Sequence, residues 1–288
     1  MPIDYNSAIR LRECDVAVSY DAKAAMLYAL ATGFGQNPLD LDELRFVFEE
    51  GLCIVPTFPS VLAVQDEFAR RLGIQYELAV HGEQSVILHA PLPDRADLLR
   101  DTHVVEILDK GADKGAVIVI ETNLRPVSSK APLVTITSTL FARGDGGFST
   151  SRRNSVSNAR STRPELIGSP DSIDEFETRR DQALLYRLTG DTNPLHVDPS
   201  VAIQAGFDRP ILHGLCTFGI CCRAVLKQRL KYQAGSIESF HARFASPVFP
   251  GETVTTEIWG KLGQIVFQAR VKERGCVVVS NGRCVLRA

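Results

Sequence analysis

Residues 28–39 read Tyr-Ala-Leu-Ala-Thr-Gly-Phe-Gly-Gln-Asn-Pro-Leu, and residues 186–195 read Tyr-Arg-Leu-Thr-Gly-Asp-Thr-Asn-Pro-Leu. The two Asn-Pro-Leu triplets begin at Asn37 and Asn193, which are 156 residues apart (193 minus 37). Pro91 and Pro247 are separated by the same interval (247 minus 91). An equal offset at two separate places indicates a duplicated domain.

Both copies have the same order of expected elements, namely a short helix, a longer apolar helix and then a run of strands. The short helices are predicted at 22–32 and 181–188, and the longer ones at 59–71 and 214–230. The strands are predicted at 76–80, 86–89, 101–108, 116–124 and 134–142 in the first copy, and at 237–244, 254–261, 265–272 and 276–286 in the second.

A helix followed by antiparallel strands predicts an α+β layer with the helix packed on one face of the sheet. We therefore expect a double hot-dog fold, in which each copy is an antiparallel sheet wrapped round a central helix. Residues 1–143 are the predicted N-terminal hot-dog domain and residues 173–288 the C-terminal one. Residues 144–172 are rich in Gly, Ser, Asn and Arg and are predicted to be the linker.

Composition excludes several classes of protein. The formal net charge is −2, so no basic excess indicates a nucleic-acid partner. The seven cysteines form no Cys-x-x-Cys pair, which favours free thiols in a reducing compartment. No apolar run approaches the ~18 residues that span a bilayer. The N-terminus has no apolar signal segment, and the C-terminal Arg-Cys-Val-Leu-Arg-Ala is not a peroxisomal Ser-Lys-Leu signal. We expect a soluble cytoplasmic protein with no nucleic-acid or membrane partner.

The strongest chemical signal is the segment from Tyr186 to Asp198, which places Asp191 and His196 five residues apart on one Gly/Pro loop. A carboxylate and an imidazole held on a rigid loop can act together on one water molecule as acid and base. Asn193 lies between them and can orient either group. The alternative is structural, because Asp and Asn in such turns usually cap backbone groups. A calcium loop is excluded, since Pro194 follows and no glycine turn or closing glutamate lies at the required spacing.

The second signal is Pro210-Ile-Leu-His-Gly-Leu-Cys-Thr-Phe-Gly219, in which Gly214 opens the long apolar helix. The N–H groups at a helix N-terminus can hold a carbonyl oxygen that gains negative charge, and glycine permits close approach of a ligand. Helix entry and packing alone explain the segment equally well. His213 is expected to orient this loop.

Residues 186–196 and 205–219 together resemble the motif of the MaoC-like R-specific 2-enoyl-CoA hydratases. The similarity is strongest to the hydratase unit of peroxisomal multifunctional enzyme type two. The N-terminal half shares it in Tyr28-Ala-Leu-Ala-Thr-Gly, Leu44-Arg-Phe-Val-Phe-Glu49 and Val55-Pro-Thr-Phe58.

The resemblance implies site residues and a division of labour between the copies. Asp191 and His196 are the implied catalytic pair, with Asn193 beside them and the Gly214 N–H on the thioester oxygen. Glu49 matches the family's glutamate best, although Glu50 is a rival. We assign substrate binding to Glu49, Tyr186 and His213. The N-terminal copy lacks the pair, since Asp40 stands in the place of the histidine, and is expected to accommodate the acyl chain.

The implied activity is R-specific hydration of trans-2-enoyl-CoA to R-3-hydroxyacyl-CoA, with no cofactor and no metal. The expected partner is an acyl-CoA substrate, and a homodimer is expected. A 3-hydroxyacyl-carrier-protein dehydratase of the same fold and a non-catalytic acyl-CoA-binding protein remain open as alternatives. The linker arginines, which guanidinium chemistry suits to phosphate, are candidates for binding CoA: Arg152, Arg153, Arg160 and Arg163.

Overall fold

The computed structural model describes residues 3–64, 66–75, 79–148, 166, 168–261 and 263–287, apart from the side chains of residues 66 and 261. The four linker arginines proposed to bind CoA lie outside these residues, so that hypothesis stays a prediction. No helix in the described ranges is long and apolar enough to cross a membrane.

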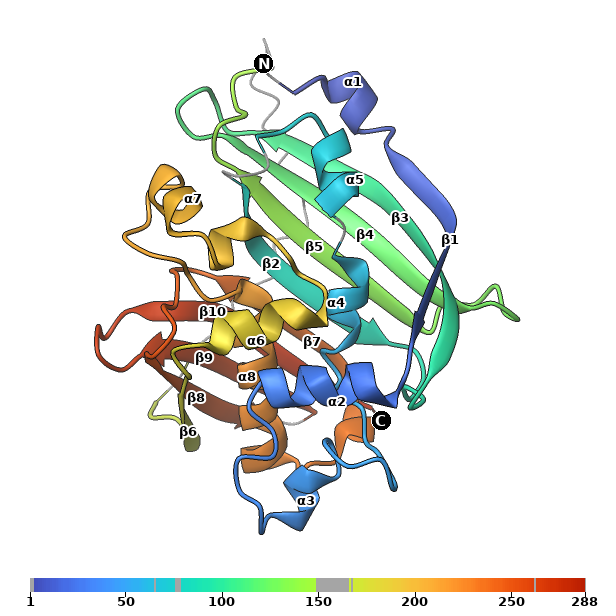
Figure 1. Ribbon diagram of the computed structural model, residues 1–288, viewed down its shortest axis with the longest axis vertical. Coiled ribbons are helices and arrows are strands. Elements are labelled where there is room, and N and C mark those ends of the chain that lie inside the picture. Colours follow the sequence, from blue (N-terminus) through green and yellow to red (C-terminus); the bar gives the residue numbers. More distant parts are fainter. Residues whose placement is uncertain are drawn as a thin grey trace.

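The strands of the described residues form one antiparallel sheet (Figure 1). They are β1 Arg12–Tyr20, β2 Ala79–Leu88, β3 Ala96–Asp109, β4 Ala116–Pro126, β5 Val134–Ala142, β6 Ser172–Glu177, β7 Ile237–Phe244, β8 Thr253–Lys261, β9 Gln264–Val271 and β10 Val277–Leu286. Their order across the sheet is β1-β3-β4-β5-β2-β7-β10-β9-β8-β6.

This order is symmetric about its centre, because β2 corresponds to β7, β5 to β10, β4 to β9, β3 to β8 and β1 to β6. The halves join where β2 pairs with β7 in antiparallel register. Ser85 lies opposite His241 in this register, and these two residues are 156 positions apart. The pseudo-two-fold relation therefore passes between them, and the predicted double hot-dog fold is confirmed.

His241 at this junction makes stability depend on pH. Burial, with a smaller contribution from the Arg283 charge, lowers the pKa of His241 from 6.5 to about 4. His241 therefore takes up a proton near pH 6.5 in the unfolded chain, but only near pH 4 in the folded chain. Stability is lost as pH falls through this window, by at most about 3 kcal/mol from this residue.

We expect a His241→Gln variant to lose less unfolding free energy than the wild type between pH 7 and pH 4. Urea denaturation at several pH values measures this difference. Between pH 7.5 and 9 the gap between the two proteins should stay constant, because His241 is neutral in both folded and unfolded chains there. Equal losses in the acid range would show that His241 titrates normally.

The helices gather on one side of the sheet (Figure 1). The α-helices are α1 Tyr5–Ala8, α2 Ala22–Ala31, α3 Leu41–Leu44, α4 Pro59–Ala63, α5 Asp66–Arg71, α6 Gln182–Tyr186, α7 Pro199–Gln204 and α8 Gly214–Arg229. The short 3₁₀ helices are η2 Arg187–Thr189, η3 Pro194–His196 and η4 Ala234–Ser236.

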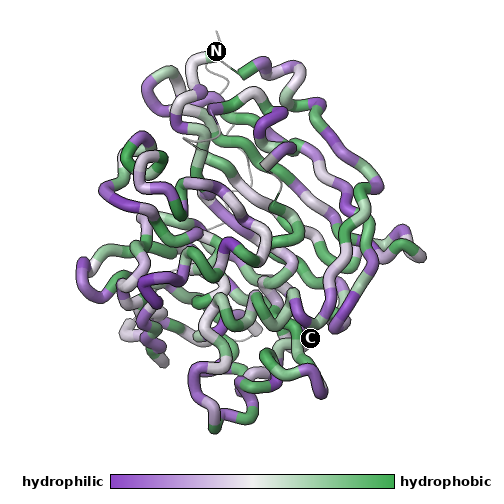
Figure 2. The backbone as a smooth tube through the Cα atoms, in the orientation of Figure 1, coloured by the Kyte–Doolittle hydropathy of each residue, from purple (hydrophilic) through white to green (hydrophobic). Residues whose placement is uncertain are grey.

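Helix α8 is the central helix of the C-terminal half. Every residue from Leu215 to Leu226 is buried, which explains why its sequence is apolar nearly all round. Hydrophobic residues also follow the strands in the middle of the sheet, whereas the peripheral loops are mostly hydrophilic (Figure 2). The helix predicted at 214–230 is confirmed.

The prediction of one helix over 59–71, at the corresponding place in the N-terminal half, is wrong in detail. This segment consists of α4 and α5, and the chain turns extended at Val64, where ψ is 125°. Two short helices replace one long one, so less of the sheet's inner face is covered in this half.

Some strand predictions also need correction. The strands predicted at 76–80 and 86–89 are parts of one strand, β2, whose pairing shifts between His81 and Glu83. Residues 76–78 lie outside the described part of the chain. Strands β1 and β6 were not predicted. Both are edge strands, and most β1 side chains are exposed or half-buried, so their sequences carry little hydrophobic alternation.

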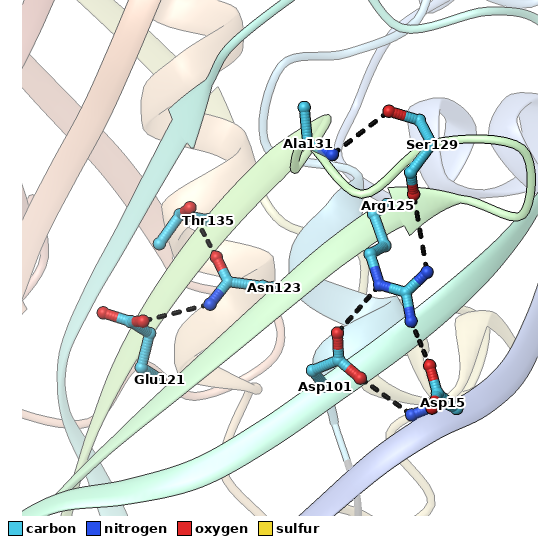
Figure 3. Close-up of polar contacts among 8 residues, drawn as sticks. All are labelled: Asp15, Asp101, Glu121, Asn123, Arg125, Ser129, Ala131 and Thr135. Atoms are coloured by element: carbon cyan, nitrogen blue, oxygen red, sulfur yellow. Dashed lines mark hydrogen bonds and ion pairs between the residues drawn. The ribbon is translucent and has the colours of Figure 1, made fainter.

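Strand β4 shows how the two faces of the N-terminal sheet differ. Its side chains alternate strictly between buried and half-buried along Ala116–Arg125. The half-buried face carries a polar network in which Arg125 donates from Nε to Asp101 Oδ2 at 3.0 Å and also pairs with Asp15 (Figure 3). The opposite face turns Thr122 and Leu124 inward, beneath the helices.

Candidate active site

The loop that carries Asp191 is held by hydrogen bonds to its own backbone. Helices α6 and η2 lead into Gly190, whose φ of 138° is readily adopted only by glycine. Asn193 Oδ1 accepts from the Leu195 N–H at 3.0 Å and so caps η3, which Pro194 opens. The Asn193 N–H donates to Asp191 Oδ1 at 3.3 Å. Asn193 thus acts as a capping residue that fixes the loop between the two candidate catalytic groups.

His196 is held in one orientation by a backbone carbonyl. Its Nδ1 lies 2.8 Å from the oxygen of Ile211, and only a protonated Nδ1 can donate to a carbonyl. In the neutral ring this places the lone pair on Nε2, which is then the atom suited to accept a proton. Asp191 and His196 are 4% and 9% exposed. Sequence reasoning did not identify Ile211, because a backbone acceptor leaves no side-chain signal.

His213 supports this pair from behind. Its Nε2 donates to the backbone oxygen of Asp191 at 3.1 Å, and its ring stacks on that of His196 with centroids 3.7 Å apart. Burial is the largest cause that holds the pKa of His213 well below 6.5, with the neighbouring His196 adding to it. His213 is therefore neutral at physiological pH and positions both groups without adding charge.

Gly214 begins α8, a helix of 16 residues. The first N–H groups of a helix have no carbonyl partner within the helix, and the dipole makes this end positive. A Cβ added at Gly214 would meet the Phe244 ring at 3.5 Å, which is an ordinary contact. Packing inside the protein therefore does not require glycine here.

We expect Gly214→Ala to fold normally and to lose activity. The added methyl group fits against Phe244, and alanine suits a helix better than glycine, so stability should be equal or higher. The methyl group also enters the space next to the N–H, and a displacement of about 1 Å can cost 100-fold in rate. Steady-state kinetics should show kcat/KM at least tenfold lower with no fall in melting temperature. Unchanged kcat/KM would exclude Gly214 from contact with substrate.

A cavity of about 210 Å³ connects these groups to the N-terminal half. A single water molecule occupies about 30 Å³ in the liquid, so this is space for a ligand. Four of the predicted site residues line it: Asp191, Asn193, His196 and Gly214. Apolar residues of the first copy form much of the opposite wall: Ala63, Val64, Phe68, Ala69, Ala79, Ile120 and Leu140.

The structure does not bring the three predicted substrate-binding residues into this cavity. Tyr186 is fully buried, and its ring packs on His213 at 4.9 Å and on Tyr28 at 5.9 Å. His213 is likewise fully buried, next to Asp191 and His196. Glu49 is exposed and does not line the cavity, and the same holds for its rival Glu50. Tyr186 and His213 therefore contact neighbouring side chains and not the cavity, and Glu49 and Glu50 lie outside it.

Asp191, His196 and His213 each offer one possible metal-ligand atom, and these atoms lie within 4.8 Å of one another. Carboxylate and imidazole are suitable ligands for Zn²⁺. An imidazole lone pair lies in the plane of its ring. The two histidine rings are stacked with an interplanar angle of only 29°, so their lone pairs do not converge on one point. The arrangement suits one water better than a metal, and absence of a metal stays a prediction.

The equivalent loop of the first copy keeps the backbone geometry without the chemistry. Asn37 Oδ1 accepts from the Leu39 N–H at 3.0 Å, as Asn193 does from Leu195. Asp40, in the place of His196, caps α3 by accepting from the Glu43 N–H. Leu39 is 85% exposed, so this loop does not border a buried site.

Two family models match the chain. The MFE-2 hydratase 2 N-terminal domain matches residues 18–144, and the MaoC-like domain matches residues 163–281. The chain is 37% identical over 277 residues to enoyl-CoA hydratase 2, peroxisomal, of Arabidopsis thaliana, covering 91% of this chain and 89% of that protein.

Two further similarities extend this comparison. Peroxisomal multifunctional enzyme type 2 of Mus musculus is 38% identical over 272 residues, which cover 91% of this chain but 36% of that larger protein. The crystal structure of a MaoC-like dehydratase from Phytophthora capsici superimposes with a TM-score of 0.83 and 32% identity, covering 99% of both chains. The resemblance inferred from the sequence motifs is confirmed.

Proposed function

We propose that this chain, which belongs to the enoyl-CoA hydratase 2 family of MaoC-like proteins, is a hydro-lyase that adds water to 2-enoyl-CoA. We assign the reaction to one site per chain, formed by Asp191 and His196 in the C-terminal half. The observation that carries this assignment is their placement, within 4.8 Å of each other, on the wall of a cavity that α8 also enters.

The geometry supports a reaction on one bound water. Hydrogen bonds of about 2.8 Å allow a single water to contact both the Asp191 carboxylate and His196 Nε2. Asp191 or His196 takes a proton from the water as the water oxygen bonds to C3, and the pair delivers a proton to C2. The C2–C3 double bond becomes a single bond, and the product is R-3-hydroxyacyl-CoA.

The thioester oxygen gains negative charge as C3 is attacked. We assign the stabilisation of this charge to the Gly214 N–H, which lies at the positive end of α8. Removing one such donor typically raises the barrier by ~3 kcal/mol. This chemistry needs no redox group, because the thioester delocalises the charge.

The acyl chain is assigned to the N-terminal side of the cavity. Helix α4 and the inner face of β4 and β5 supply apolar wall residues there, and the first copy has no catalytic pair of its own. Calorimetric titration with a saturated acyl-CoA is expected to give one molecule bound per chain. Two per chain would contradict the assignment.

A direct assay separates this function from its nearest alternative. We expect rapid loss of the ultraviolet absorbance of the conjugated thioester in crotonyl-CoA, and a much slower reaction when the same acyl group is carried by acyl-carrier protein. Preference for the carrier protein would identify a dehydratase of that class. Tight acyl-CoA binding without turnover would identify a binding protein.

Two predictions from the sequence extend this proposal. We propose a cytoplasmic location, which fractionation tests, although the named relatives include peroxisomal proteins. We also propose a homodimer, which sedimentation equilibrium tests.

A further inference from the structure

Five polar side chains form a belt on the inner side of the N-terminal half, where a hydrophobic core is expected. Four are at most 3% exposed and Ser138 is half-buried. We call them the polar belt: Ser60 on α4, Gln84 on β2, Thr102 on β3, Thr122 on β4 and Ser138 on β5. All except Gln84 line the cavity that reaches Asp191 and His196.

The belt is continuous across four adjacent strands. Thr102 lies opposite Thr122, with their hydroxyl oxygens 3.2 Å apart. Gln84 lies opposite Ser138, which donates from Oγ to Gln84 Oε1 at 2.8 Å. Ser138 lies opposite Ile120, two residues from Thr122, so the two pairs are diagonal neighbours.

The C-terminal copy shows what the fold itself requires at these positions. The 156-residue offset relates Ser60, Gln84 and Thr102 to Cys216, Phe240 and Ile258. Strand pairing relates the other two, because Phe267 lies opposite Ile258 and Cys284 lies opposite Phe240. All five counterparts are apolar and at most 1% exposed: Cys216, Phe240, Ile258, Phe267 and Cys284.

Five apolar positions in one copy are thus polar in the other. In the C-terminal half the apolar set packs against α8. In the N-terminal half the helix is broken into α4 and α5, and four of the five positions, all except Gln84, face a cavity. The fold itself does not require the exchange, because apolar residues fill the same five positions in the other half.

The belt also has unused hydrogen-bonding capacity. Among the described residues, Gln84 Nε2 and Ser60 Oγ are buried and have no hydrogen-bond partner. Both residues are 1% exposed. Buried polar groups in native proteins nearly always have a partner, and Ser60 lines the cavity, where a bound water or a ligand oxygen can supply one.

We infer that this site takes acyl-CoA substrates whose chain carries a hydroxyl or oxo oxygen that bonds to the polar belt. This inference rests on the proposed function and specifies its substrate class. The belt offers hydroxyl and amide donors together with acceptors, which suits a neutral oxygen group. The five residues carry no charge, and an unpaired carboxylate would be costly to bury beside them.

The strand order fixes roughly how far this oxygen lies from the reacting carbons. Phe244 on β7 borders Gly214, and Ser138, Thr122 and Thr102 lie on the second, third and fourth strands from β7. Neighbouring strands are about 4.8 Å apart, which gives roughly 10–19 Å along the curved sheet. The oxygen therefore belongs in the distal part of a medium or long chain.

The test compares trans-2-decenoyl-CoA with its 6-, 7-, 8-, 9- and 10-hydroxy derivatives. We expect at least one isomer to exceed the unsubstituted chain in kcat/KM by roughly tenfold, the value of one additional neutral hydrogen bond. This ratio should fall to about one or below in the double variant Thr122→Val/Ser138→Ala. Preference of the wild type for the unsubstituted chain over every isomer would overturn the inference, and would indicate that the belt only orders water.

A matched control is Thr256→Val, which removes a buried hydroxyl from the inner side of β8, where Oγ1 donates to Cys221 Sγ at 3.9 Å. Thr256 does not line the cavity, so this variant should keep the wild-type ratio. If the double variant also keeps it while folded, the belt does not recognise the oxygen.

Failure of the proposed function is visible separately. If crotonyl-CoA and every other enoyl-CoA remain unhydrated, that function is wrong. Calorimetry with decanoyl-CoA and its hydroxylated derivatives then tests the belt alone, since binding requires no turnover. Tighter binding of one hydroxylated chain, lost in the double variant, would support the inference, and equal or weaker binding of all of them would overturn it.

Discussion

Replacing Asp191 with Asn or His196 with Gln should reduce hydration of 2-enoyl-CoA by at least about 100-fold and as much as 10,000-fold, the usual contribution of a general acid or base. Both variants should fold, because the contacts that hold the loop involve backbone atoms. His213 bonds to the backbone oxygen of residue 191, and Asn193 caps its own turn. The measurement is kcat at saturating substrate, with circular dichroism to confirm folding.

Two features of the data would identify a shared water. The double variant should lose little more activity than the worse single variant, since the two groups act as one unit. Asp198→Asn is the matched control on the same loop. Asp198 caps α7 by accepting from the Ser200 N–H, and Asn caps helices equally well, so activity should be nearly unchanged. Near-normal turnover by either folded single variant would refute the assignment of the pair.

The second large effect concerns stability. Glu43→Ala should lower the free energy of unfolding by about 3–5 kcal/mol, the usual cost of leaving a buried charge unpaired. Glu43 comes from the first copy and is 1% exposed. It pairs with Arg223 on α8 at 2.7 Å and accepts from the Tyr232 hydroxyl at 3.2 Å. Without it, the ion pair that Arg223 retains is the longer contact of 3.4 Å with Asp174, which also pairs with Lys227, so denaturant unfolding should shift strongly.

Glu175→Gln is the control for this prediction. Glu175 is the neighbour of Asp174 on β6 and pairs with Lys272 at 2.6 Å, but both side chains are about half exposed. Exposed pairs contribute at most about 1 kcal/mol, so this variant should unfold almost like the wild type. If Glu43→Ala were no worse than Glu175→Gln, the buried network would not join the two copies.

The duplication of the fold was predictable from the sequence, because the two copies keep an equal offset between their motifs. The interval between Asn37 and Asn193 also relates Ser85 to His241, where the halves join. The break at Val64 was not predictable, since the sequence around it has no glycine or interior proline. That break depends on how α4 and α5 meet the sheet, which is tertiary information.

The candidate site was predicted in part. Asp191, His196 and Gly214 lie together on the cavity because two local motifs fixed their loops. Glu49 was selected by family register alone and lies exposed, away from the cavity. The stacking of His213 on His196 was not predictable, because it depends on how α8 approaches the loop.

The polar belt was not predicted either, although the sequence contains a signal for it. Thr102 and Thr122 occupy inward positions of strands whose other inward residues are largely apolar. Aligning the strands of the two copies, and not only their motifs, would have revealed the exchange with Ile258 and Phe267.

The configuration of the product shows most directly whether Asp191 and His196 hold the attacking water. Wild-type protein should convert trans-2-decenoyl-CoA to 3-hydroxydecanoyl-CoA, which chiral chromatography or a stereospecific dehydrogenase resolves into its enantiomers. A water held by Asp191 and His196 on one face of the substrate predicts a single enantiomer, and the resemblance to the R-specific hydratases predicts that it is R. Asp191→Asn should lose that product. Formation of the S enantiomer, a racemic product or no product would contradict the account.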